Sequence, residues 1–428
     1  MGQHHSLSVV DAAEQLMYSR ALNSIHWMSL DANSKEFTAS VASSVEQKVA
    51  RFARSCMHFE SSLGDLKKFM AEHHLPWPKA PRWDLLEILL DLSGNWNLHL
   101  WFQLAFEMTP FRGGTGEPVL RITQSTAFGT WIALMRSFAG QPVASTSALR
   151  YRRYVKEMLR FFGVHESSSD EIVTKIEDAN RLTLEALGPA MAEPNLRTLR
   201  MPIRNLTESV TPGIAAGRLL LLFNEYFIWA RRFSAGDIVE VVNPGLLRSV
   251  IYLLGLKSET REALTLSLGL RVAHELGWMA HRGIADVTLD IMGLPPSAHY
   301  RRCLTVIESA VGVGWLSLFP EQPAAETLVQ EVQDILDDSV QRCGKPPLRL
   351  QVRKTPAEWD SESLLANALP EPTPGAHFFI DWMYLMNARW RLQEQDLSNV
   401  LKLGSVLNHR ANLHSTLTVT EEYFVFPF

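Results

Sequence analysis

The sequence has no run of about 18 apolar residues, the shortest stretch that usually spans a membrane as a helix. Its most apolar piece, Leu219–Phe223, is followed at once by Asn224 and Glu225. Residues 1–30 also lack the charged and then apolar pattern of a secretory signal. No signal peptide or transmembrane segment is therefore visible, and the compartment in which the protein works is not written in the chain itself.

A large excess of charge of either sign is also missing. The chain has 41 lysines and arginines against 46 aspartates and glutamates, which gives a net charge of -5. Its arginine pairs, Arg152–Arg153, Arg231–Arg232 and Arg301–Arg302, are isolated doublets, whereas nucleic-acid-binding proteins usually gather basic residues into one patch. We therefore expect no nucleic-acid partner.

The zinc-binding helix motif H-E-x-x-H does not occur in the 428 residues. In that motif two histidines four residues apart bind one zinc ion, and the glutamate activates the bound water. The nearest approach, His274–Trp278, has a tryptophan at the second ligand position, and the next histidine is His281. His274 and His281 could return to one helix face after about two turns, but two ordinary helix-face histidines are the better interpretation. We predict no metal ligand and no catalytic residue in this chain.

A phosphate-binding loop is a further class of site that the sequence does not support. The glycine cluster Gly113–Gly116 lacks the lysine and hydroxyl residue of a P-loop. It also lacks a strand-to-helix pattern with an acidic residue about 20 positions later. We predict a β-turn between two strands at this place.

The residues that are present favour a helical protein. With 46% hydrophobic and 20% charged residues, the chain can build one large core or two. In Glu326–Cys343, apolar residues recur at helical spacing and acidic residues fill the other face. Three further helical segments are Arg152–Phe162, Gly213–Arg232 and Leu246–Met279, the last divided into two helices near Lys257–Glu259.

Two local signals refine this prediction. Ser258 is a plausible N-cap for the second helix of the divided segment. The alternation of Leu348–Val352 is typical of a short strand. We therefore predict a mainly α-helical protein with a few short strands.

Several short motifs occur in an order that is known from one protein family. They are Phe52–Met57, Trp77–Pro78, Leu120–Gln124, Tyr151–Val155, Asn243–Leu247, Tyr300–Cys303, Ala310–Gly312 and Val419–Phe428. Each resembles a segment of the neprilysin and endothelin-converting-enzyme family of zinc metalloendopeptidases. Phe52–Met57 is similar to its Y-R-S-C-M segment and Tyr300–Cys303 to W-R-R-C, whereas Thr123 replaces the aspartate of I-D-Q. The resemblance covers most of the chain.

The resemblance implies a particular domain organisation. It predicts a poorly matched N-terminal extension over residues 1–35 and a neprilysin-like helical cap domain over residues 36–415. Residues 416–428 are then the first strand of a catalytic domain that the chain does not contain, so that the sequence is truncated with respect to the family. In these enzymes the cap encloses a cavity that admits peptides.

The resemblance also implies modifications. Three cysteines alone say little, but the matched flanks imply a disulfide between Cys56 and Cys303. Cys343 has no counterpart and is a free or intermolecular thiol. The sequon at Asn205 is a glycosylation site only if the chain is secreted. By family resemblance the protein is extracellular or on the cell surface.

The last segment implies a weak substrate-binding strand. Val419–Tyr423 resembles V-N-A-Y-Y, the edge strand that holds the substrate backbone in the family, and its Asn-Ala falls on Thr420 and Glu421. A threonine hydroxyl cannot replace an amide that both donates and accepts, so the resemblance implies weak substrate binding by Thr420 and Glu421. The alternative role of Glu421 and Glu422 is to prevent an exposed edge strand from pairing with other chains, because charged side chains disfavour such pairing.

Three functional readings follow from these residues. The first is a member of the zinc metalloendopeptidase family, whose enzymes process peptides. This chain is then non-catalytic by itself, because it lacks the H-E-x-x-H helix with which the full-length enzymes of the family bind zinc. The second is a fragment of an active zinc endopeptidase that continues past Phe428. The third is a non-enzymatic scaffold that binds peptides or proteins. The expected partners are peptides in a cap-domain cavity and the missing catalytic domain.

Overall fold

The computed structural model describes residues 45–58, 61–80, 83–108, 118–139, 145–193, 197–227, 232–311, 349–353, 369–372, 377–395 and 423–427. The chain divides into two compact units. Unit 1 comprises Met1–His58, His299–Ala376 and Ser398–Phe428, and unit 2 comprises Phe59–Ala298 and His377–Leu397. The domain limits predicted near residues 35 and 415 lie outside the described residues and stay predictions, as do the statements on Glu326–Cys343.

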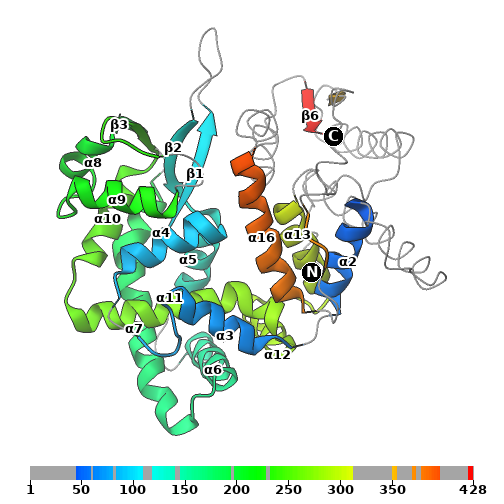
Figure 1. Ribbon diagram of the computed structural model, residues 1–428. Coiled ribbons are helices and arrows are strands. Elements are labelled where there is room, and N and C mark those ends of the chain that lie inside the picture. Colours follow the sequence, from blue (N-terminus) through cyan, green and yellow to red (C-terminus); the bar gives the residue numbers. More distant parts are fainter. Residues whose placement is uncertain are drawn as a thin grey trace. The chain divides into compact units, whose positions relative to one another are not determined.

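Unit 2 is built around one central helix, α11 (Ser258–Ala280). From Leu264 onward α11 is buried on all sides apart from Glu275, as expected of a helix whose apolar residues are not confined to one stripe. It packs against α3 (Leu63–Glu72), α6 (Thr146–Phe161), α7 (Glu166–Met191), α12 (Arg282–Met292) and α16 (Phe378–Gln395). Figure 1 shows α11 running through the middle of this unit.

The remaining helices of unit 2 surround this arrangement. They are α4 (Leu85–Trp96), α5 (Thr126–Ala139), α8 (Ile203–Ser209), α9 (Ala216–Tyr226) and α10 (Pro244–Leu254). The start of α10 shows how local sequence sets a helix boundary: Asn243 Oδ1 accepts a hydrogen bond from Leu246 N–H at 2.9 Å, and Pro244 follows as the first helical residue. The predicted mainly α-helical fold is confirmed.

The predicted helix boundaries need three corrections. The helix expected over Arg152–Phe162 begins earlier, at Thr146, because the Ser145 side chain caps α6 by accepting the Ala148 N–H at 3.1 Å. The break between α10 and α11 is where the sequence indicates it, but Ser258 is the first residue of α11 and the capping position is Lys257, which makes no side-chain cap. The helix expected over Gly213–Arg232 is shorter, because Gly213 has a φ of 91° and α9 ends at Tyr226. A left-handed φ is incompatible with a continuing helix.

A mixed four-stranded sheet lies at one end of unit 2 (Figure 1). Its order is β1 (Phe102–Met108), β2 (Pro118–Gln124), β4 (Ile238–Val241) and β3 (Leu199–Pro202). β1 and β2 are antiparallel with Leu104 opposite Ile122, and β2 and β4 are parallel. The predicted strand pair before Gln124 is confirmed, while its connection, Gly113–Gly116, lies outside the described residues.

Unit 1 contains α2 (Val45–Met57), nearly all of α13 (Ala298–Val311), and two strands, β5 (Arg349–Arg353) and β6 (Tyr423–Pro427). The strands expected at Leu348–Val352 and in the last ten residues are confirmed. They pair in parallel, with Leu350 opposite Phe424.

A buried lysine ties a loop to α2. Lys48 Nζ donates to the Leu369 carbonyl at 2.8 Å and lies 3.1 Å from Glu371, while the lysine side chain is 6% exposed. Arg51 of the same helix lies 3.6 Å from Glu371. A buried charge is tolerated when it is paired in this way.

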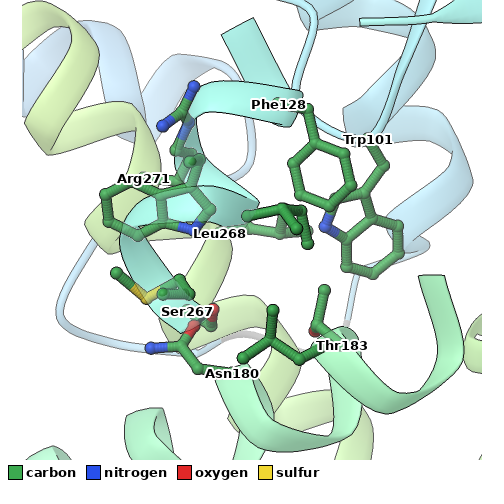
Figure 2. A pocket seen from close by; sticks show the side chains of 11 residues that line it. Trp101, Phe128, Asn180, Thr183, Ser267, Leu268 and Arg271 are labelled. Atoms are coloured by element: carbon green, nitrogen blue, oxygen red, sulfur yellow. Dashed lines mark hydrogen bonds between the residues drawn. The ribbon is translucent and has the colours of Figure 1, made fainter. Parts of the chain in front are cut away.

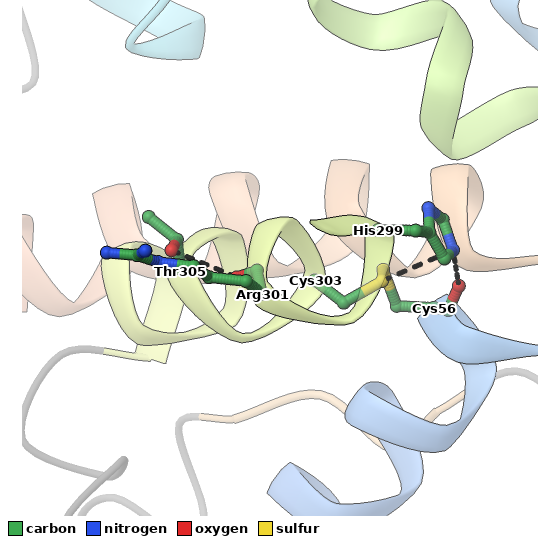
Figure 3. Close-up of a disulfide and its surroundings, with 5 residues drawn as sticks. All are labelled: Cys56, His299, Arg301, Cys303 and Thr305. Carbon is green, nitrogen blue, oxygen red and sulfur yellow. Dashed lines mark hydrogen bonds between the residues drawn. A yellow bond between two sulfur atoms is a disulfide. The ribbon is translucent and has the colours of Figure 1, made fainter. Parts of the chain in front are cut away.

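Cys56 and Cys303, the pair that the family resemblance implies, form a disulfide between α2 and α13. Both residues are fully buried. His299, one turn before Cys303, donates from Nε2 to the Cys56 carbonyl at 3.2 Å and lies 3.7 Å from Cys303 Sγ (Figure 3). Because 247 positions separate the two cysteines, the bridge closes a loop that contains nearly all of unit 2.

Candidate functional site

The predicted substrate-binding residues, Thr420 and Glu421, lie outside the described residues, just before β6. What the structure describes is the strand itself. β6 pairs with β5 from Tyr423 to Pro427, and within the described part of the chain β5 is its strand partner. A strand paired on one edge still has a second row of backbone donors and acceptors.

The two histidines at a seven-residue spacing do not share a ligand. His274 is buried in α11, where its Nδ1 is 2.8 Å from the Tyr154 hydroxyl and its ring lies edge-on to Trp131. His281 instead terminates α11, and its Nδ1 accepts the Gly283 N–H at 3.1 Å. Each imidazole is thus used by a neighbouring group of the same unit.

The described ranges contain no group of three or more histidine, cysteine or acidic residues that could hold a metal ion. A catalytic zinc site needs three such ligands around one open position. The histidine, cysteine and acidic side chains of the described residues therefore do not fit the catalytic zinc ion of the family that the sequence resembles. We derive no hydrolytic step from them. Among the same residues, no helix combines the length and the apolar character that crossing a membrane requires.

The sequon residue Asn205 lies in the first turn of α8 and is exposed. Thr207, its hydroxyl partner in the sequon, donates to the Ile214 carbonyl at 2.9 Å. The asparagine side chain can therefore be reached from solvent, while the threonine helps to fix the turn that follows. Glycosylation at Asn205 stays a prediction.

A line of buried polar side chains, which the sequence analysis did not single out, crosses the helices of unit 2. The Ser267 hydroxyl donates to Asn180 Oδ1, and Asn180 Nδ2 donates to the Tyr151 hydroxyl, both at 2.6 Å. Burial raises the pKa of the Tyr151 phenol far above its ordinary value, so the hydroxyl keeps its proton. These bonds join α11, α7 and α6, and because every group finds a partner they fix the helices relative to one another.

Arg271 is the charged residue at the centre of this region. Its guanidinium donates to the Ala127 carbonyl at 2.8 Å, lies 2.5 Å from Glu275 and stacks over the Trp131 ring at 4.7 Å. Burial lowers the pKa of Arg271, and the Glu275 carboxylate acts in the opposite direction. The paired arginine thus anchors α5 to α11.

Figure 2 shows the small cavity beside these groups. Its walls include Trp101, Phe128, Asn180, Thr183, Ser267 and Arg271. The cavity volume is about 10 Å³, which is the room that one water molecule requires. Neither a peptide nor a cofactor fits, so this polar centre is a structural element.

A second polar cluster has the residue types of a nucleophilic site. Ser93 accepts the Leu104 N–H and donates to His99 Nδ1 at 2.8 Å, and His99 Nε2 then donates to Asn97 Oδ1 at 2.9 Å. Ser93, however, is only 3% exposed, so no substrate reaches its hydroxyl. The cluster connects the end of α4 to β1, where Asn97 has a left-handed φ of 55°.

Comparisons with known proteins identify the fold. No protein-family model and no curated protein sequence matches the chain. The zinc metalloprotease Zmp1 of Mycobacterium tuberculosis in its open state matches 90% of this chain with a TM-score of 0.55 and 14% identity. PepO of Lactobacillus rhamnosis matches 87% of this chain with a TM-score of 0.52 and 11% identity. Inhibitor-bound Zmp1 matches 90% of this chain with a TM-score of 0.51 and 12% identity.

The chain spans 58–60% of the length of these solved structures. At identities of 11–14% the similarity concerns the fold and says nothing about individual residues. This chain therefore has a mainly α-helical, neprilysin-like fold, which it shares with about 60% of the length of Zmp1 and of PepO.

Proposed function

We propose that this chain is the peptide-selecting part of a zinc metalloendopeptidase of the neprilysin type, and that its 428 residues bind peptides without hydrolysing them. The observation that carries the proposal is the similarity of fold to the zinc metalloprotease Zmp1 over 90% of the chain. The ordered motifs between Phe52 and Phe428 support the same family. The donor set of the described residues, which does not fit zinc, supports a separation of binding from hydrolysis.

The strand β6 supports a mode of binding. An extended peptide can add to a sheet edge through backbone hydrogen bonds, with side-chain pockets giving specificity. β6 pairs with β5 through Tyr423–Pro427, which leaves its other edge available among the described residues. We infer that peptides align along this edge, next to Thr420 and Glu421.

Peptide binding can be measured directly with the purified chain. We expect the fluorescence anisotropy of a fluorescein-labelled mixture of unstructured decapeptides to rise with protein concentration, equally with zinc and with a chelator. Mass spectrometry of the same mixture should find no cleavage. Zinc-dependent cleavage would favour an active enzyme, and an unchanged anisotropy at the highest protein concentration would refute peptide selection.

Two neighbouring proline substitutions locate the binding edge. Successive backbone N–H groups of a strand point to opposite sides, and proline removes the donor. Of Phe424→Pro and Val425→Pro, one therefore removes a donor to β5 and lowers stability. The other is expected to weaken peptide binding about three- to tenfold, the value of one net hydrogen bond, with an unchanged melting temperature. Equal peptide affinity in both variants would place binding elsewhere.

We also propose that the chain works outside the cell or on its surface. The closed disulfide supports this location, because disulfides persist in oxidising compartments, and the exposed Asn205 offers a modification that can be tested in a secreted chain. When the chain is expressed behind a secretory leader, removal of N-glycans should increase its electrophoretic mobility. The Asn205→Gln variant, which keeps an amide at the same position, should show no such change. A secreted native chain without a mobility shift would contradict the glycosylation.

A further inference from the structure

One residue connects two helices of unit 2. His281 follows the last residue of α11 and precedes the first residue of α12, with an extended backbone at φ -155° and ψ 125°. Its N–H donates to the Gly277 carbonyl at 2.9 Å, which ends α11. Its Nδ1 accepts the Gly283 N–H at 3.1 Å, which begins α12. The imidazole is therefore an N-cap, and only a ring nitrogen without a proton can accept this bond.

The turn around His281 is closely packed. A Cβ on Gly277 would lie 2.7 Å from Ile284 Cγ2, and a Cβ on Gly283 would lie 2.7 Å from Phe161 Cζ. Ile284 is fully buried. The start of α12 therefore packs closely against Phe161 and α11, so the hydrogen bond from Gly283 to His281 bears directly on how α12 begins.

Charged groups of two other helices surround Phe161, whose ring contacts His281. The His281 ring contacts the Phe161 ring at 4.9 Å between centroids. Lys67 of α3 donates to the Phe161 carbonyl at 3.1 Å, and Arg160 of α6 lies over the Phe161 ring at 5.6 Å while paired with Glu157. The N-terminus of α12 adds the positive end of a helix dipole.

We propose that His281 makes the α11–α12 turn a proton-sensitive hinge, in which the neutral imidazole caps α12 and the protonated imidazole releases it. Protonation converts the acceptor into a donor that faces the Gly283 N–H, and it adds a cation beside Lys67 and the helix dipole. The lost acceptor, the repulsion from Lys67 and the repulsion from the helix dipole all weaken the cap of α12 when His281 is protonated.

The direction of the pH dependence follows from the same contacts. Burial, and then the charge of Lys67, lower the pKa of His281 below its ordinary value of 6.5. The unfolded chain therefore binds the proton more readily than the folded one. The stabilisation by the cap is fully present above pH 6.5 and is lost as the pH falls from there through the lowered pKa.

The test is hydrogen exchange of the amides of residues 282–292 in the full chain, corrected for the intrinsic exchange rate at each pH. Between pH 7.5 and 5.5 we expect protection of these amides to fall about tenfold in the native protein, the value of one N-cap. His281→Asn keeps a capping acceptor that does not titrate, so its protection should not change. Equal protection of the native protein at both pH values, or an equal loss in H281N, would overturn the proposal.

The chain offers a matched control and a second variant. His165 caps α7 in the same way, accepting the Ser167 N–H at 3.4 Å, but it is exposed. His165→Asn should therefore leave the exchange of residues 282–292 as in the native protein. Lys67→Met removes the neighbouring cation, which raises the pKa of His281 towards its ordinary value and should make the loss of protection between pH 7.5 and 5.5 smaller than in the native protein. A loss of the same size would refute the role of the cation, even if H281N does not fold.

Discussion

Replacement of both Cys56 and Cys303 by alanine is expected to lower the free energy of unfolding of unit 1 by about 2–4 kcal/mol. The bridge joins positions 247 residues apart, and loop-closure entropy for a chain of that length corresponds to about 5 kcal/mol as an upper value. The effect is smaller because unit 2 lies inside the loop, and a folded unit 2 already restricts the distance between the two cysteines.

Hydrogen exchange as a function of urea concentration measures this effect for each unit separately. The amides of α2 and α13 should become exposed at lower urea, whereas those of α7 and α11 should not change. Cys343→Ser provides the background for both proteins, because it removes the third thiol and prevents disulfide exchange. Unchanged protection of α2 and α13 after loss of the bridge would show that packing alone holds these helices.

Substitution of Gly269 by alanine is expected to cost about 2–3 kcal/mol of stability in unit 2. A Cβ at this position would lie 2.2 Å from Cδ1 and 2.7 Å from Cγ of Trp77. The indole cannot move away easily, because its Nε1 donates to the Leu266 carbonyl at 2.9 Å and its ring lies edge-on to Phe162 at 4.7 Å. The new methyl group therefore separates α11 from the segment after α3.

Gly64→Ala is the matched control, since nothing lies within 4 Å of a Cβ at Gly64 in helix α3. Alanine is the better helix former by about 0.5–1 kcal/mol, so this variant should be slightly more stable. Urea unfolding at equal protein concentration compares the two. A Gly269→Ala protein as stable as the native one would show that Trp77 is not confined as the structure describes.

Much of the local structure could be predicted from neighbouring residues. The helix over Arg152–Phe162 and the division before α11 depend on periodicity and capping within a few positions. The same is true of the strand at Leu348–Val352, whereas the motif at Asn243–Leu247 entered through the family resemblance. The predicted N-cap at Ser258 was wrong. Lys257 is the capping residue and makes no side-chain bond, so the Ser258 hydroxyl does not cap α11.

Among the candidate sites, some features are visible in short sequence motifs and others exist only through packing. The pairing of Cys56 with Cys303 was implied by the family resemblance of the two segments that flank these cysteines, and the absence of H-E-x-x-H could be read directly from the letters. The bonds of Ser267 to Asn180 and of Asn180 to Tyr151 join residues 87 and 29 positions apart. No periodicity connects such residues, because the contact exists only when three helices pack together.

By itself, therefore, the sequence determined the helical class, the place of several helices and strands, and the absence of a zinc-binding helix motif, since these depend on interactions within one or two turns. Only the tertiary structure decided that α11 is the centre of unit 2, that β5 and β6 are parallel partners, and that His281 caps a helix beside Lys67. The physical reason is that burial, hydrogen-bond partners and the pKa of a histidine depend on residues that the fold brings together from distant parts of the chain.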